Sequence, residues 1–167
     1  MPTAESIGRD LAARYPYPRW AFAREVPSGT GGRRYRVADG IAYALWPSDR
    51  HEIDGFEIKV SRSDWRRELR TPWKAEEIAA YCHRWWLVIP TPEIIRPGEL
   101  PAGWGILTYD STRRLRVHTR PAVRDPLPLP PGFVAGFVQA ALLRGPDARR
   151  PADLRPRGVW EDVEGPA

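Results

Sequence analysis

The stretch HEIDGFEIKVSRSDW, residues 51–65, decides how this chain folds. Apolar Phe56 and Ile58 occupy every second position at its centre. Charged Glu57 and Lys59 fill the alternate positions, and this period of two is typical of a strand that buries one face. Glu57 and Lys59 then share the other face, about 7 Å apart along the backbone. The simplest interpretation is an ion pair on a solvated face of a sheet.

A second acidic residue changes that interpretation. Asp39 lies in RVADGIAYALW, residues 36–46, which is another strand-like run. A hairpin between the two runs would set Asp39 beside Glu57, with Lys59 next to both. Hard divalent cations prefer oxygen ligands in that arrangement, and metal-assisted hydrolysis of a phosphodiester uses such a cation with a nearby lysine. We therefore expect the candidate site at Asp39, Glu57 and Lys59.

Composition limits the class of protein. The chain has 167 residues, 42% of them hydrophobic and eight of them tryptophan, which predicts one globular domain with a real core. The net charge of +5 is consistent with a nucleic acid or another anionic partner, but does not choose between them. The single cysteine, Cys82, excludes an internal disulfide framework and a cysteine-based zinc site.

No membrane partner is expected. No apolar run approaches the ~18–20 residues that a membrane span needs, and the N-terminus lacks the layout of a signal peptide. A cytoplasmic protein is the resulting expectation.

The N-terminal half reads as a helix followed by three strands. Thr3 caps a helix that ends near Arg14, and strands follow over 20–26 and 37–46, before the strand centred on Glu57. The glycine-rich loop 28–32 lacks the Gly-Lys-Ser/Thr of a phosphate-binding loop and is interpreted as a hairpin connection.

A helical segment and a return strand come next. Ser61 is a candidate cap for the helix after Lys59, and Thr71-Pro72 is a candidate start for a second helix. That second helix has an apolar stripe made of Ile78, Tyr81, Cys82 and Trp85. Residues 86–89 are continuously apolar, as in a buried parallel strand.

The C-terminal third contains a hairpin, a connector and one more helix. Strands are expected over 104–109 and 114–119, and a proline-rich connector follows over 121–131. A helix is expected over 133–143. The organisation is thus a domain over 1–120, a connector with the C-terminal helix over 121–145, and a poorly ordered tail over 146–167.

This order of elements, with Asp39 on the second strand and Glu57-x-Lys59 on the third, resembles the PD-(D/E)XK nuclease superfamily. Within it, GFEIKVSRSDW (55–65) and YCHRWW (81–86) resemble MmcB-like DNA repair proteins and related nuclease-like proteins of bacteria and their phages. The resemblance implies an α/β fold with a restriction-endonuclease-like core, in which helices flank a central mixed β-sheet. A C-terminal helix and a disordered tail would follow this core.

The resemblance also implies a mechanism. Asp39 and Glu57 would hold Mg²⁺, for which Mn²⁺ could substitute, with the backbone carbonyl of Ile58 as a third oxygen. Lys59 would position or activate the attacking water and counter the charge that builds on the phosphate. A further acid often comes from the first helix or first strand, and Glu5 or Glu25 could serve. Each is equally well explained as a surface acid.

Basic and aromatic side chains near these residues are candidate DNA contacts. Arginines before Asp39 and after Lys59 could contact phosphates as a cluster, although any one of them is more often a solvated surface residue. These are Arg33, Arg34, Arg36, Arg62 and Arg66. Trp65 and Trp73 could stack on bases, but both are expected in the core. Glu52 and Asp54 are left out of the site because they share the face of Phe56.

Three hypotheses follow. The first is a Mg²⁺-dependent DNA endonuclease or repair-associated nuclease, a hydrolase of phosphodiester bonds. The second is a DNA-binding module that keeps the nuclease fold without cutting. The third is a structural protein in which Glu57 and Lys59 form a plain ion pair. DNA is the expected partner in the first two, and a homodimer or a repair or phage protein is a further candidate partner.

Overall fold

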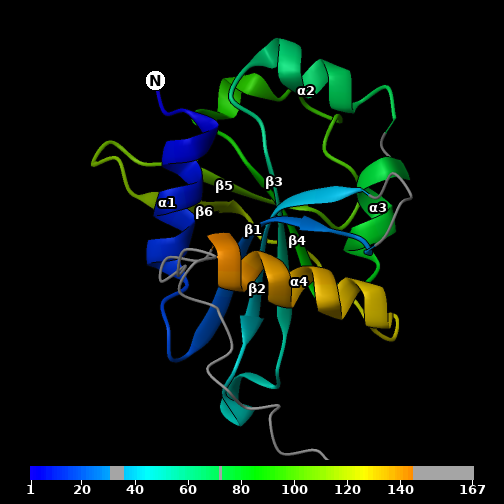
Figure 1. The fold of residues 1–167 in the computed structure, drawn as a ribbon. Helices are drawn as coiled ribbons and strands as arrows, with labels where there is room; N and C mark the ends of the chain where they lie inside the picture. The colour runs from blue at the N-terminus through cyan, green and yellow to red at the C-terminus, as the bar shows by residue number, and fades with distance from the viewer. Residues whose placement is uncertain (31–35, 72, 145–167) are drawn as a thin grey trace, which may run out of the picture.

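Six strands of the described chain form one mixed sheet, and their order in the sheet follows their order in the sequence (Figure 1). A computed structural model describes residues 1–30, 36–71 and 73–144. The strands are β1 (Trp20–Pro27), β2 (Val37–Ala44), β3 (Ile53–Ile58), β4 (Arg84–Val88), β5 (Gly105–Tyr109) and β6 (Leu115–Thr119). β3, β4 and β5 run parallel, whereas β1–β2–β3 and β5–β6 are antiparallel.

Helices cover both faces of this sheet, so the fold is α/β. They are α1 (Ala4–Arg14), α2 (Arg62–Glu68), α3 (Trp73–Ala79) and α4 (Pro131–Arg144), with short 3₁₀ turns η1 (Pro47–Asp49) and η2 (Pro92–Ile94). α1 packs Ile7 and Leu11 on one face. The other face carries α3 and α4, with Ile78 and Phe133 in its core.

The period of two assigns the residues of β3 to alternate faces as predicted, but the prediction that only one face is buried is wrong, because both faces pack in a core. Phe56 and Ile58 are buried on the α1 face with Phe22. Ile53 belongs to the opposite core, and Gly55 lies against the ring of Trp85 on that side. Glu57 therefore projects from the face opposite Phe56.

The predicted helix caps at Thr3 and Ser61 are also confirmed. The Thr3 hydroxyl accepts the N–H of Ser6, and the Ser6 hydroxyl accepts the N–H of Thr3, which together form a capping box. The Ser61 hydroxyl accepts the N–H of Asp64 at 3.1 Å and starts α2. The predicted hairpin of β5 and β6 and the last helix are both present.

The helix predicted through Trp85 is wrong. α3 ends at Ala79, and Trp85 lies on β4. His83 ties the intervening turn to the start of β3, because its N–H donates to the Ile53 carbonyl and its ring Nδ1 accepts the Ile53 N–H. Ile78, Tyr81, Cys82 and Trp85 have the spacing of one face of a helix. In the structure, however, they belong to a short helix, a turn and a strand in succession.

The core prediction is correct for Trp65 and wrong for Trp73. Trp65 is fully buried, whereas 67% of the Trp73 surface is exposed at the first residue of α3. The predicted tail, 146–167, lies outside the described residues. Within the described part of the chain, no helix has the length and apolar character to cross a membrane.

We predict that Gly55→Ala destabilises the fold. A Cβ at this position would lie 2.3 Å from two ring atoms of Trp85 and 2.9 Å from the Cys82 sulfur. Overpacking of this kind costs about 1–3 kcal/mol, measurable as a lower free energy of unfolding in urea.

Gly132→Ala is the matched control, since the nearest atom to its Cβ would be 3.5 Å away. Alanine in α4 should leave stability unchanged or raise it slightly. Equal stability of the Gly55 and Gly132 variants would contradict the packing of Trp85 on β3.

Candidate functional site

The site is built where β2 and β3 separate. Their pairing runs from Tyr43↔Ile53 to Gly40↔Phe56, and Asp39 is the next residue of β2. The Asp39 carboxylate accepts the backbone N–H of Ile58 at 2.7 Å. A side chain thus takes the hydrogen bond that a neighbouring strand would otherwise supply, and Asp39 is held against the end of β3.

Lys59 joins two carboxylates at the same end of β3. Its ammonium lies 2.5 Å from Glu57 Oε1 and 3.1 Å from Glu68 Oε2. The Lys59 side chain is 12% exposed, so these charges are largely withdrawn from water. Its backbone N–H donates to the Val88 carbonyl at 3.0 Å, which fixes this residue to the end of β4. The group therefore lies at the carboxyl ends of two parallel strands, the usual place for a site in an α/β sheet.

The ionisation of the two acids of the motif is linked. Burial and then the negative charge of Asp39 raise the pKa of Glu57, which is about 7 with the opposing effect of Lys59 included. Burial likewise raises the pKa of Asp39, partly offset by the Ile58 N–H and by Lys59. Two carboxylates that resist joint ionisation form a site that gains from a bound cation.

Lys59 remains a cation in this setting. Burial alone would lower the pKa of Lys59, but the negative charges of Glu57 and Glu68 outweigh burial and raise it. The ammonium is thus suited to a fixed positive charge rather than to a base that takes up a proton.

Glu25 lies opposite Asp39 on the neighbouring strand. The pairs Arg24↔Gly40 and Val26↔Ala38 flank the position, which sets Glu25 across from Asp39. Glu25 has a φ of 51°, a left-handed conformation that is uncommon for a residue other than glycine inside a strand. Strain of this kind is often found at functional sites, so Glu25 is the better placed of the two candidate further acids.

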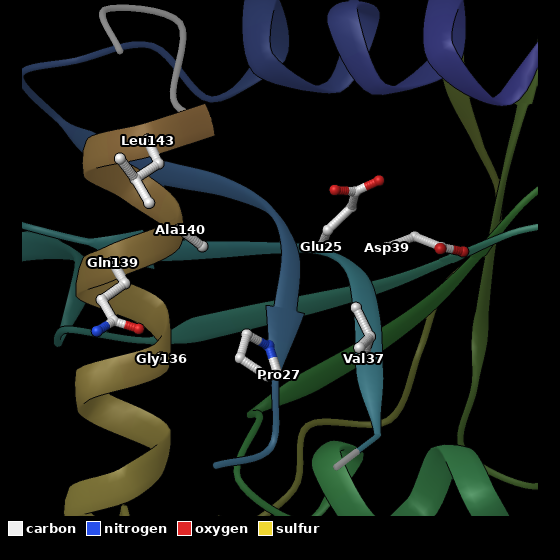
Figure 2. A pocket seen from close by; sticks show the side chains of 8 residues that line it. All are labelled: Glu25, Pro27, Val37, Asp39, Gly136, Gln139, Ala140 and Leu143. Atoms are coloured by element: carbon white, nitrogen blue, oxygen red, sulfur yellow. The ribbon is translucent and has the colours of Figure 1, made fainter. Parts of the chain in front are cut away.

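Glu25 and Asp39 line one cavity of about 560 Å³. Figure 2 shows their side chains on adjacent strands, with Gln139, Ala140 and Leu143 of α4 across the cavity. Glu5, the other candidate, is exposed in the first turn of α1, where an acid favours the helix N-terminus.

The candidate arginines are dispersed in their contacts. Arg36 lies 3.7 Å from Glu77 and borders a small cavity with Glu57. Arg62 binds both carboxylate oxygens of Glu99, so it joins α2 to the loop between η2 and β5.

Of the remaining three, Arg66 is exposed on α2, next to the Arg67 that follows it. Arg33 and Arg34 lie outside the described residues.

Sequence reasoning missed Glu68, which contacts Lys59 from α2. Two signals were available. Glu68 ends a helix, where negative charge is unfavourable, and it lies four residues after Asp64, where like charges repel. An acid kept in spite of both effects indicates a tertiary partner, which is Lys59. The missed Lys74 lines the small cavity that Glu57 and Glu68 share.

The donor set suits a cation with few protein ligands. Within the described residues, no group of three or more His, Cys, Asp and Glu side chains is arranged to hold a metal ion. Asp39 and Glu57 each have one oxygen in a hydrogen bond, which leaves one oxygen of each for another partner. Mg²⁺ is commonly held by one or two carboxylates together with waters and substrate phosphates, and this pair fits that pattern.

Comparison with known proteins adds the fold alone. No protein-family model and no curated protein matches the sequence. Among solved structures, the chain is similar to a protein of unknown function from Silicibacter pomeroyi, with a TM-score of 0.54 and 19% sequence identity. The similarity covers 88% of this chain and 92% of that one.

We predict that the site lowers stability as pH rises. The raised pKa of Glu57, together with that of Asp39, means that the folded protein binds more protons than the unfolded chain between the ordinary carboxyl range and pH 7. The free energy of unfolding contributed by this pair is therefore highest below pH 4.5 and falls towards pH 7, by at most about 1.4 kcal/mol per pH unit for one group.

The measurement is urea unfolding of wild type and Glu57→Gln from pH 5 to 8 in EDTA. Glutamine keeps the shape and removes the titration, so the stability of wild type should fall relative to the variant as pH rises. Parallel pH profiles would show that Glu57 ionises normally.

Proposed function

We propose that this protein is a metal-dependent DNA nuclease of the PD-(D/E)XK type, with a restriction-endonuclease-like core. The observation that carries the proposal is the hydrogen bond from the Ile58 N–H to the Asp39 carboxylate. It holds Asp39 against Ile58, the residue between Glu57 and Lys59, and this supports a shared site for the three residues of the motif. A strand in which Glu-x-Lys forms only an ion pair would not need an acid such as Asp39 on the neighbouring strand.

The topology supports the same core. A helix precedes an antiparallel meander of three strands, and helices then lead to a fourth strand that is parallel to the third. The motif residues occupy β2 and the end of β3, where the resemblance requires them. β3 is paired on both sides up to Phe56, and its pairing with β4 continues through Ile58, next to the motif residues.

Each residue then has a chemical role. Asp39 and Glu57 would hold Mg²⁺ or Mn²⁺, with the Ile58 carbonyl as a third oxygen. The cation, when bound, would supply Lewis-acid stabilisation of the phosphate and lower the pKa of a water. Lys59, kept protonated by its two carboxylate neighbours, would orient the attacking water and offset negative charge on the phosphate. Glu68 would act as a positioning residue, because it holds the ammonium of Lys59 from the side of α2.

A DNA-binding module without catalysis is the alternative. Two ion pairs occupy the ammonium of Lys59, which favours a structural use of this residue. The two buried acids argue against the binding module. Negative charge repels phosphate, so a protein that only binds DNA gains nothing from Asp39 and Glu57, whose raised pKa values show that their ionisation is unfavourable here. The nuclease therefore accounts for more of the site.

We predict that Lys59→Ala lowers the rate of cleavage by about 10²–10³. The change removes a preorganised positive charge and leaves both candidate metal ligands in place. The assay is cleavage of a panel of duplex, single-stranded, flap and junction DNA by purified protein in Mg²⁺, in Mn²⁺ and in EDTA.

Two further variants make the assay specific. Glu57→Gln should abolish cleavage and weaken metal binding, whereas Arg9→Gln, an exposed change on α1, should cut at the wild-type rate. If wild type binds DNA but cuts no substrate of the panel with either metal, the binding-module alternative replaces the nuclease.

A further inference from the structure

A second polar cavity lies at the opposite end of the sheet from Lys59. It has a volume of about 780 Å³ and opens at the amino ends of β3 and β4, beside Asp54 and Arg84. In Figure 1, the turn η1 that borders it lies at the bottom of the sheet, and α2 lies at the top. Asp54 is also on the α1 face, the face opposite Glu57, and about 17 Å of strand separates it from Lys59. The two sites are therefore distinct.

The acids of this cavity already have partners. Arg84 contacts Glu52 at 2.5 Å and Asp54 at 3.4 Å. The buried Tyr15 hydroxyl donates to the other oxygen of Asp54 at 3.0 Å. Asp49 binds the guanidinium of Arg19 through both carboxylate oxygens. These ion pairs line the cavity and offset most of the negative charge of its acids, so little charge remains to repel an anion.

Three arginines at the same cavity have no acidic partner in the described part of the chain. Arg14, Arg50 and Arg120 all line it and are exposed. Within the described residues, no carboxylate lies at ion-pair distance from any of them; Arg14 donates instead to the Leu115 carbonyl at 3.2 Å. The mouth of the cavity therefore carries positive charge that is available to an anionic partner.

Aromatic rings lie beside these charges. Trp20 lines the cavity, and 47% of the Trp46 surface is exposed at the start of η1. The guanidinium of Arg19 lies 5.8 Å from the centre of the Trp46 ring, and Asp49 holds that guanidinium in place. An exposed tryptophan with one face ordered by an arginine is a ready surface for stacking.

We propose that this cavity and Trp46 form a binding surface for single-stranded nucleic acid. Phosphates would contact Arg14, Arg50 and Arg120, and a base would stack on Trp46. Basic grooves with interleaved aromatic rings bind single strands in this way, since an unpaired base offers its face. A simple anion would use the arginines but would leave the exposed ring without a role. The proposal is independent of whether Asp39 and Glu57 support cleavage.

The test is binding of a fluorescent twelve-residue oligothymidylate to the full chain, measured by anisotropy in EDTA, where metal-dependent cutting does not occur. Arg50→Asn with Arg120→Gln should weaken binding at least tenfold and reduce the salt dependence by about 1.4 in logarithmic slope. Asparagine is chosen because Arg50 has a φ of 55°, which asparagine tolerates. Trp46→Ala should weaken binding by about 5- to 100-fold.

The control variant Arg9→Gln with Arg96→Gln removes the same charge from exposed positions elsewhere and should bind as wild type. Thermal unfolding verifies that each variant is folded. The proposal would be overturned if the variant with Arg50→Asn and Arg120→Gln bound the oligonucleotide as tightly as the control variant does. The proposal would also be overturned if inorganic polyphosphate competed as well as unlabelled oligonucleotide and Trp46→Ala had no effect on binding. That result would define a surface for simple anions.

Discussion

The hydrogen bond between the Ile58 N–H and the Asp39 carboxylate is the interaction on which the candidate site depends. It forms where the ladder of β2 and β3 stops, one residue beyond Gly40↔Phe56. A main-chain donor at the end of a strand must find an acceptor, and here a side chain provides it. The same bond holds a second carboxylate where its charge influences the ionisation of Glu57. One contact thus links the geometry of the sheet to the electrostatics of the candidate site.

Bringing these charges together has a consequence for stability. The ammonium of Lys59 pairs with two carboxylates, those of Glu57 and Glu68, and Asp39 adds a further negative charge to a region that is largely closed to water. Burial, together with the negative charges of Asp39 and Glu68, raises the pKa of Glu57, so ionisation of this residue destabilises the folded state. A structural ion pair would need only one acid. A divalent cation bound there would offset the excess negative charge, which supports the proposed metal-dependent activity.

The sequence predicts the sheet well, because the period of two in 53–58 assigns each residue of β3 to a face. It also predicts the hairpin of β2 and β3, whose antiparallel pairing ends one residue short of Asp39 and Glu57. It could not show that β2 pairs with β3 only from Gly40 onwards, nor that α2 packs Glu68 onto Lys59, because both depend on tertiary packing. Trp85 was misassigned because its spacing fits a helix as well as a turn followed by a strand. The chemical roles of the site residues remain proposals.

The most direct measurement is anomalous diffraction from crystals grown with Mn²⁺. The account predicts one manganese peak at the end of β3, within about 2.0–2.6 Å of an oxygen of Asp39 and an oxygen of Glu57, with Lys59 beside it. A saturated crystal with no peak there, or with manganese bound by Glu57 and Glu68 and not by Asp39, would contradict the claim that the Asp39–Ile58 contact builds a metal site.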